Sequence, residues 1–394
     1  MTMTHNMPRV LKEASTVLQM IEEHQYEAYF VGGCMRDFLL QRPIEDVDIT
    51  TSATPEQLMK IFPDVIPVGV EHGTVIVRYE HVSYEITTFR HENIAINERL
   101  LSEDLQRRDF TINAIAMNQH GKIIDLFNGQ ADLKNSRIQT VGHANDRFTE
   151  DPLRILRAIR FVSQLNFTIE RATLEAMKDL KHLLKSVAVE RITNELRLIF
   201  QGEYVQSAIE LMKEVKLQKV LPVFQEVPSL LDKLPKNTTS FVTVAEVIAL
   251  FHYIDRNISI TTWTKKWKLP NETKQSATSL VTLLDYYLQY GVNNWLAYQL
   301  PKNEQPSFFH LIGLVCHSDI KEEFMKVYHN LPVTSRVQLE FNGSDLQNIF
   351  RDYPRGRWIS ETLTEIEYDI VMGKLTNSKN AIKEWIKCHP PEVN

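Results

Sequence analysis

The sequence predicts an α+β protein, in which a mixed sheet with helices fills the first part of the chain and helices fill the rest. Up to about Val141, β-branched and aromatic runs alternate with short helical segments, and Gly, Asp or Asn bound several of the runs. From Glu150 onward, apolar residues recur at three- and four-residue spacing, as they do in amphipathic helices. At 394 residues the chain exceeds one compact core, so several domains are expected.

Six segments of the first part are expected to form strands, because their apolar residues are alternating or continuous: 28–31, 47–50, 73–79, 83–89, 114–117 and 122–127. The helical pattern that follows predicts helices at 152–165, 172–187 and 190–200. Proline-containing breaks at 222–235 and 331–332 divide the helical remainder. The predicted domains are therefore 1–145, 146–208, 209–330 and 331–394.

Composition excludes several classes of protein. The chain is 43% apolar and 24% charged, as expected of an ordinary globular protein. It has neither a long apolar run nor a secretory signal, so no membrane partner is expected. Its three cysteines are far apart, which predicts a reducing cytoplasm and no metal–thiolate site. The net charge of -6 weighs against nucleic-acid binding on average, although a local cluster of basic residues can override it.

A double glycine follows the first expected strand. Gly32 and Gly33 lie between that strand and a short helix at 34–40, so their backbone N–H groups could face an anion, with Arg36 adding a charged donor. The dinucleotide and Walker patterns are both absent. The alternative is a tight turn without a ligand.

Alternating carboxylates follow about one helix later. In a strand, Asp46 and Asp48 would point to one face while Val47 packs inward. Two such carboxylates repel each other unless a cation lies between them, and oxygen ligands suit Mg²⁺. Glu85, on another expected strand, could add a third carboxylate. The alternatives are a solvated acidic turn and a Glu85 that is merely exposed and paired with Arg78.

These residues amount to a resemblance. The pattern GGxxRDxLL followed by DxD resembles the nucleotidyltransferase superfamily typified by DNA polymerase β. More specifically, the chain resembles the class II tRNA nucleotidyltransferases, which build the CCA end of tRNA. Four further family motifs occur in the expected order: RRDFTINA at 107–114, DLFNG at 125–129, EDPLR at 150–154 and ERITNEL at 190–196. The similarity is strong over about residues 20–210 and loose beyond.

The resemblance implies a polymerase β-like catalytic head (1–145), a base-reading neck (146–208), a body (209–330) and a tRNA-binding tail (331–394). It implies transfer of CTP, or of CTP and ATP, to the 3′ end of tRNA with release of pyrophosphate. Two Mg²⁺ ions would be held by the catalytic Asp46 and Asp48, with Glu85 as the third catalytic carboxylate. Nucleotide binding would fall to Gly32, Gly33, Arg36, Arg108, Asp109, Asn113, Glu150, Asp151, Arg154 and Arg157.

Two of these positions have a role that follows from hydrogen bonding. On one helical face, Asp151 could accept from the amino group of cytosine or adenine, while Arg154 donates to the ring nitrogen beside it. Uracil and guanine present the opposite order, so each would leave a buried group unpaired at a cost of about 1–3 kcal/mol. The alternative is a surface ion pair. For Asp109, ribose recognition competes with an N-cap of a helix beginning at Phe110.

The segment between the second carboxylate strand and the RRDF motif departs from the family. Residues 91–102 are roughly ten residues short and lack the family's Tyr and Arg-Arg-Pro features. In the family, a shortened loop marks enzymes that add only two cytidines and leave the adenosine to a separate A-adding enzyme. Asn128 also replaces a usual glycine, although Asn tolerates the left-handed conformation.

RNA binding is expected from the helical part. Lys265, Lys266 and Lys268 surround Trp267, and cations among aromatic rings suit RNA. Core packing is the favoured alternative for the tryptophans themselves. The function predicted is CC addition to tRNA; the alternatives are full CCA addition, a poly(A) polymerase, and an RNA-binding protein without activity.

Overall fold

The structure, a computed structural model, describes residues 7–68, 73–89 and 101–391. Most of the segment 91–102, on which the CC-only prediction depends, lies outside the described residues. The chain divides into two compact units, Met1–Pro228 and Ser229–Asn394. Their boundary falls within the predicted break at 222–235, while the finer division into four domains stays a prediction.

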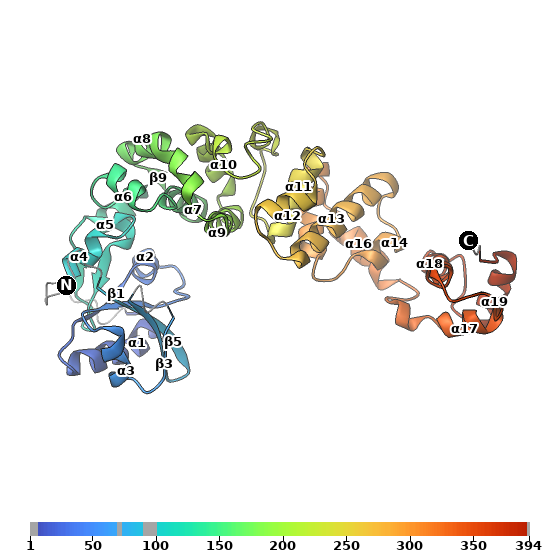
Figure 1. Cartoon of the computed structure of the whole chain (residues 1–394), viewed down its shortest axis with the longest axis horizontal. Coiled ribbons are helices and arrows are strands. Elements are labelled where there is room, and N and C mark those ends of the chain that lie inside the picture. The colour runs from blue at the N-terminus through green and yellow to red at the C-terminus, as the bar shows by residue number, and fades with distance from the viewer. Residues whose placement is uncertain (1–6, 69–72, 90–100, 392–394) are drawn as a thin grey trace. The chain divides into compact units, whose positions relative to one another are not determined.

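A seven-stranded sheet organises the first unit, with the strand order β3-β4-β5-β2-β1-β6-β7 (Figure 1). Strands β2 and β5 pair in parallel, and the other neighbouring strands are antiparallel. The strands are β1 (Ala28–Val31), β2 (Asp48–Thr51), β3 (Val65–Ile66), β4 (Thr74–Tyr79), β5 (Val82–Thr88), β6 (Ile115–Met117) and β7 (Ile123–Asp125). All six predicted segments therefore contain a strand. Within this sheet, β3, a two-residue edge strand, is the one that was not predicted.

Short helices pack on this sheet. In α1, Leu11, Ala14, Leu18 and Ile21 are buried at helical spacing, and the helix contacts β1. The other elements of the head are α2 (Gly33–Leu39), α3 (Pro55–Ile61), α4 (Leu101–Gln106), the 3₁₀ turn η3 (Thr111–Asn113) and α5 (Gly129–Lys134); α1 itself spans Arg9–Glu23.

The rest of the first unit is helical, as predicted, with one exception. Its α-helices are α6 (Ala144–Glu150), α7 (Arg154–Leu165), α8 (Arg171–Leu180), α9 (Val189–Phe200) and α10 (Val205–Val215). Helix α7 packs against α9 and α10. The exception is β9 (Thr168–Ile169), which pairs in parallel with β8 (Arg137–Ile138). The predicted helix at 172–187 forms as α8 followed by the 3₁₀ turn η4 (Lys181–Ser186).

The second unit contains the α-helices α11 (Val244–Ile254), α12 (Ile260–Lys266), α13 (Asn271–Tyr290), α14 (Asn294–Gln299), α15 (Gln305–Cys316), α16 (Lys321–His329), α17 (Gly343–Ile349), α18 (Arg357–Val371) and α19 (Lys379–Cys388). Short 3₁₀ turns are η5 (Leu217–Lys219) in the first unit and η6 (Leu231–Lys233) and η7 (Arg336–Gln338) in the second. A separate core around Phe341, Trp358 and Ile366 joins α17, α18 and α19. Among the described residues, no helix has the length and apolarity needed to cross a bilayer.

Candidate active site

The double glycine forms the turn between β1 and α2. Gly32 has φ +76° and ψ -131°, a backbone conformation that strains any residue with a side chain. A Cβ there would lie 3.2 Å from both Asp48 Oδ2 and Arg108 Nη1. The Gly33 amide is hydrogen-bonded to the Asp48 carboxylate. The glycines thus let a carboxylate and a guanidinium approach the backbone closely.

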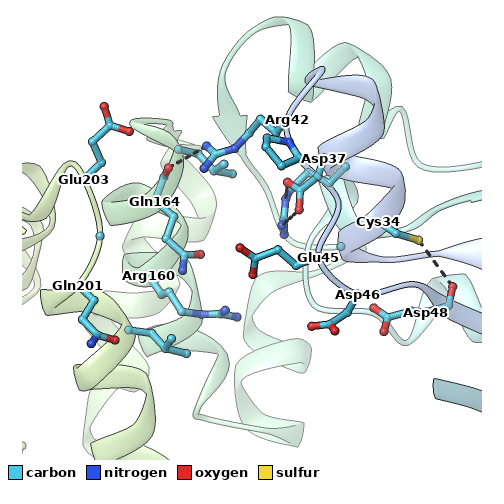
Figure 2. A pocket seen from close by; sticks show the side chains of 16 residues that line it. Cys34, Asp37, Arg42, Glu45, Asp46, Asp48, Arg160, Gln164, Gln201 and Glu203 are labelled. Atoms are coloured by element: carbon cyan, nitrogen blue, oxygen red, sulfur yellow. Dashed lines mark hydrogen bonds and ion pairs between the residues drawn. The ribbon is translucent and has the colours of Figure 1, made fainter. Parts of the chain in front are cut away.

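The three predicted catalytic carboxylates gather at one end of the parallel strand pair. Asp48 begins β2 and is the register partner of Glu85 in β5. Asp46 is exposed and precedes β2, whereas Val47 is buried as expected. Figure 2 shows Asp46 and Asp48 beside each other. Burial raises the pKa of Asp48 to about 6, and the charges of Glu85 and Asp46 add to the rise, while Arg108 and the Gly33 amide oppose it.

A divalent cation suits this group of side chains. Within the described ranges, no three His, Cys, Asp or Glu side chains already form a metal cage. Asp46 and Asp48 nevertheless offer oxygen ligands only, the kind that Mg²⁺ prefers. Partial burial, and then the charges of Glu85 and Asp46, raise the pKa of Asp48, and a bound cation would favour its ionised form. The residues present therefore fit a Mg²⁺ ion held by Asp46 and Asp48.

A continuous chain of polar contacts crosses the opposite side of the site. Arg36 Nη1 donates to Asn113 Oδ1 at 3.1 Å, and Asn113 Nδ2 donates to Asp109 Oδ1 at 3.1 Å. Asp109 Oδ2 accepts from Arg157 Nε at 2.8 Å. Arg36 is also held by a bidentate contact with Asp37 at 2.8 and 3.0 Å. These side chains are fixed before any ligand binds.

Asp109 is 8% exposed, and its carboxylate accepts from Asn113, Arg157 and the Phe110 amide. Burial by itself would raise the pKa of Asp109, but Arg157 and the hydrogen bonds from Asn113 and the Phe110 amide hold it well below its ordinary value. The alternative N-cap role is wrong in its expected form. The 3₁₀ turn η3 begins at Thr111, and its N-cap is Phe110, so Asp109 contacts only the amide that precedes the turn.

Glu195 extends this network to α9. Its carboxylate lies 2.9 Å from Arg160 Nε and 3.7 Å from Arg157 Nη1. The Arg160 guanidinium lies 4.7 Å from the centre of the Phe161 ring, and those of Arg36 and Arg157 lie 5.1 and 5.8 Å from it. The motif at 190–196 therefore contributes a carboxylate that steadies the arginines of α7.

The predicted base-reading residues adopt an arrangement that differs from the expected single helical face. Asp151 has φ -142° and ψ 97° in the break between α6 and α7, whereas Arg154 is the first residue of α7. The Asp151 carboxylate pairs with Arg191 at 2.9 Å, not with Arg154. Arg154 instead contacts Glu150 at 2.9 Å and the Arg107 carbonyl at 2.8 Å. The prediction of a shared helix was wrong, because Pro152 follows Asp151 and excludes it from the α-region.

One cavity of about 450 Å³ brings most of these residues together. We call it the Asp109 cavity. The predicted residues that line it are Gly32, Gly33, Arg36, Asp48, Arg108, Asp109, Asn113, Asp151, Arg154 and Arg157. Asp46, Glu85 and Glu150 are outside its lining, and Glu150 instead pairs with Arg147 and Arg154.

Four further lining residues were not predicted: Leu153, Arg160, Phe161 and Arg191. The spacing of Arg154, Arg157 and Arg160 at every third position could have identified Arg160, because such residues share one helical face. Arg191 lies on another helix, within the motif at 190–196, but nothing in that motif assigned its side chain to this cavity. Arg108, which was predicted, is held at 2.9 Å by the buried Asp104 of α4.

The predicted hinge and the predicted RNA-binding lysines lie elsewhere. Asn128 adopts the left-handed conformation, with φ 60°, as expected, and Asp125 accepts from the Gly129 amide at 2.8 Å. A Cβ at Gly129 would lie 2.2 Å from the Thr111 carbonyl oxygen, so glycine is needed there. Lys265, Lys266 and Lys268 are exposed in the second unit, and Trp263 and Trp267 are buried, which confirms the core alternative for the tryptophans.

Known proteins resemble this chain over nearly its whole length. A family profile described as "Poly A polymerase head domain" matches residues 28–139, and one described as "tRNA nucleotidyltransferase domain 2" matches residues 239–386. The CCA-adding enzyme of Oceanobacillus iheyensis is 46% identical over 393 residues, which cover 97% of this chain and 98% of that protein. The CCA-adding enzyme of Bacillus cereus is 37% identical over 390 residues, covering 95% and 98%.

Solved structures of CCA-adding enzymes are also similar to this chain over nearly its whole length. The Bacillus stearothermophilus CCA-adding enzyme, determined in complex with CTP, aligns with a TM-score of 0.89 at 34% identity and covers 97% of this chain and 98% of that one. The Thermotoga maritima CCA-adding enzyme, determined with tRNA, aligns with a TM-score of 0.66 at 23% identity, covering 97% and 96%, and supports the fold alone.

Proposed function

Since the chain belongs to the tRNA nucleotidyltransferase family whose members are named CCA-adding enzymes, we propose that it adds two cytidines from CTP to the 3′ end of tRNA and stops there. The observation that carries the proposal is the Asp109 cavity, which joins the double glycine, Asp48 and the candidate base readers in one space. Its volume of about 450 Å³ lies in the range typical of small-molecule sites.

The wall of the Asp109 cavity can select a base without a nucleic-acid template. Asp151 would accept from the amino group of cytosine, and Arg154 would donate to the adjacent ring nitrogen. Both side chains already have partners, Arg191 for Asp151 and Glu150 for Arg154. These partners already hold Asp151 and Arg154 in place. A bound base would add its hydrogen bonds to theirs, so binding would not have to immobilise the two side chains.

The double glycine and the basic side chains around it would hold the triphosphate. Arg36 and Arg108 line the cavity together with Gly32, and each is fixed by a carboxylate, Asp37 for Arg36 and Asp104 for Arg108. Asp109 and Asn113 would face the ribose hydroxyls, with Arg157 keeping Asp109 ionised. Mg²⁺ held by Asp46 and Asp48 would neutralise charge on the attacking and leaving oxygens of the in-line transfer.

The restriction to cytidine rests on the segment between Phe89 and the RRDF motif. Adenine can make the same two hydrogen bonds, but its second ring requires Asp151 and Arg154 to move back. We infer that the longer loop of the family's CCA-adding members drives that movement, because a shortened loop marks members that add only two cytidines. The segment 91–102 is short, so the pocket is expected to stay set for cytosine, and the adenosine would come from a separate A-adding enzyme.

Full CCA addition is the second candidate, because relatives up to 46% identical carry the name CCA-adding enzyme. A poly(A) polymerase is a weaker third, resting on the head profile alone. A tRNA substrate and the three dispersed cysteines favour a cytoplasmic location.

Product length separates these functions. Purified protein, given CTP, ATP, Mg²⁺ and a tRNA that ends at its discriminator base, should extend it by two nucleotides and stop. A product ending in CCA would contradict the CC-only proposal, and long adenosine tails would indicate a poly(A) polymerase. Replacing residues 91–102 with the full-length loop of a CCA-adding relative should permit the third addition. If the graft fails while the wild type stops at CC, the restriction lies in the pocket or at Asn128.

A further inference from the structure

The second unit holds a hydroxyl, an imidazole and a carboxylate in one hydrogen-bonded row. Thr239 Oγ1 lies 2.7 Å from His310 Nε2, and His310 Nδ1 is hydrogen-bonded to Glu246 Oε1. The three residues come from the segment before α11, from α15 and from α11. We call them the Thr239 triad. None of the three lines the Asp109 cavity.

The protonation of the imidazole follows from its two partners. An ionised carboxylate can only accept a hydrogen bond, so His310 Nδ1 carries the proton that it donates to Glu246. In the neutral ring, Nε2 is then unprotonated and accepts from the Thr239 hydroxyl. An imidazole in this state can take the hydroxyl proton while the oxygen attacks an electrophile, which is the role of a general base.

The carboxylate is placed to support a positive charge on the imidazole. Glu246 is fully buried in the first turn of α11, and its Oε2 accepts from the Val242 amide at 2.8 Å. Within the described ranges, no Lys or Arg forms an ion pair with it, and His310 is its cationic partner. A buried carboxylate is costly unless it is paired, so it would stabilise the imidazolium that proton transfer creates.

The hydroxyl can be reached from solvent. Thr239 is exposed, and the His310 side chain is 19% exposed, with its ring packed edge-on to Phe241. The Thr239 and Ser240 amides donate to no acceptor in the part of the chain that the structure describes. Backbone N–H groups beside a nucleophile can stabilise the oxyanion that forms when the nucleophile attacks a carbonyl group.

A cavity of about 680 Å³ lies along the same two helices. Leu250 of α11 lines it one helical turn after the triad carboxylate, and Leu314 of α15 lines it one turn after the triad imidazole. Its lining also includes the apolar residues Pro235, Ile254 and Val315 and the basic residues Lys233 and Lys236. Such a lining favours a substrate with an apolar chain.

We propose that the Thr239 triad hydrolyses carboxylic esters that carry an apolar acyl chain. Thr239 Oγ1 bonds to the ester carbonyl carbon, and its proton passes to His310 Nε2. The alcohol leaves with that proton, and the acyl group stays on Thr239. Water then attacks the acyl group and gives a proton to His310, which returns it to the Thr239 oxygen as the carboxylic acid leaves. Glu246 is a positioning residue, and the activity is independent of transfer to tRNA.

Ester hydrolysis tests the proposal. Wild-type protein should release p-nitrophenol from p-nitrophenyl butanoate, and Thr239→Val should lower kcat/KM about a hundredfold or more. Thr261→Val changes another exposed threonine of the second unit, in α12, and should hydrolyse the ester as the wild type does. Thermal unfolding checks that each variant is folded. Equal hydrolysis by the wild type and Thr239→Val would overturn the assignment.

Covalent labelling locates the nucleophile. A fluorophosphonate with an alkyl chain should lose fluoride and leave its phosphonyl group on Thr239, where peptide mass spectrometry would find it. Glu246→Gln keeps the size of the side chain but removes the charge that supports the imidazolium, so labelling should slow about tenfold or more. No label on the wild-type Thr239, or an unchanged labelling rate in Glu246→Gln, would overturn the triad.

Discussion

The two halves of the candidate site handle buried charge in opposite ways. In the paired half, Asp109 is compensated by Arg157, and the pKa of Asp109 falls well below its ordinary value. In the carboxylate half, Asp48 is half-buried beside Glu85 and Asp46, and the pKa of Asp48 rises to about 6. The paired half is complete within the protein, whereas the carboxylate half needs a cation to balance it. Under the proposed function, the paired half would orient the nucleotide and the carboxylate half would hold the metal.

The largest expected effect comes from removing the carboxylate half. Asp46→Ala or Asp48→Ala should lower the rate of CTP incorporation about a thousandfold or more, because the metal contributes several kcal/mol to the transition state. Affinity for tRNA should be nearly unchanged. Asp64→Ala, an exposed carboxylate beside β3, is the matched control and should behave as wild type. Single-turnover kinetics in Mg²⁺ measures the rates, and substantial turnover by either variant would contradict the metal assignment.

The next effect concerns stability, with a different sign in each half. Asp109→Asn removes the closer partner of the Arg157 charge and leaves it only Glu195 at 3.7 Å, so the free energy of unfolding should fall by about 3 kcal/mol. Asp48→Asn removes a crowded charge and should leave that free energy equal or higher without metal. Urea denaturation of both variants measures the difference. Equal destabilisation by the two substitutions would abolish the distinction between the halves.

A smaller effect is expected on base selection. Asp151→Ala removes the acceptor proposed for the cytosine amino group, and the CTP preference over UTP should fall about tenfold or more. The ratio of kcat/KM for the two nucleotides measures it. Since Asp151 is paired with Arg191, the variant Arg191→Ala tests how far Arg191 orients the Asp151 side chain, apart from the contact of Asp151 with the base. That variant should raise KM for CTP and UTP together, and an unchanged ratio in Asp151→Ala would remove the base-reading role.

The smallest effect is an acid dependence of stability. The pKa of Asp109 is lower in the folded protein than in the unfolded chain, so its contribution is present above about pH 4 and is lost as pH falls below that value. On acidification from about pH 5 to about pH 3, the Asp109→Asn variant should therefore lose less stability than the wild type. Thermal unfolding across this range provides the comparison. Parallel curves for the two proteins would show that Asp109 is not stabilised by its partners.

Local patterns in the sequence predicted the architecture and the identity of most lining residues. The strands around the carboxylates carry strong apolar alternation, so their positions could be predicted within a residue or two. What the sequence could not predict was partner choice. Asp151 and Arg154 are close in sequence, yet Asp151 pairs with Arg191, and Arg154, beside its local partner Glu150, donates to the Arg107 carbonyl; Arg191 and Arg107 come from distant segments.

For the same reason, the sequence could not predict the contact between Glu195 and Arg160. The family motif at 190–196 includes Glu195, but the contact of Glu195 with Arg160 depends on how α9 packs against α7. Likewise, strand alternation placed Asp46 and Asp48 on one face, although Asp46 precedes the strand and remains exposed. Periodicity describes a residue's own element and carries no information about the neighbouring element.

The parallel pairing of β2 with β5 also bears on the order of folding. At the Thr51 end the pairing is stabilised, because Ile49 and Ile86 are buried and the Phe89 amide donates to the Thr51 carbonyl at 2.7 Å. Its outer end sets Asp48 beside Glu85, and like charges in register oppose pairing. The two strands are therefore expected to pair first at Thr51 and last at Asp48 during folding, and to separate first at Asp48 during unfolding. The catalytic end of the sheet would close last, and Mg²⁺ would slow its reopening.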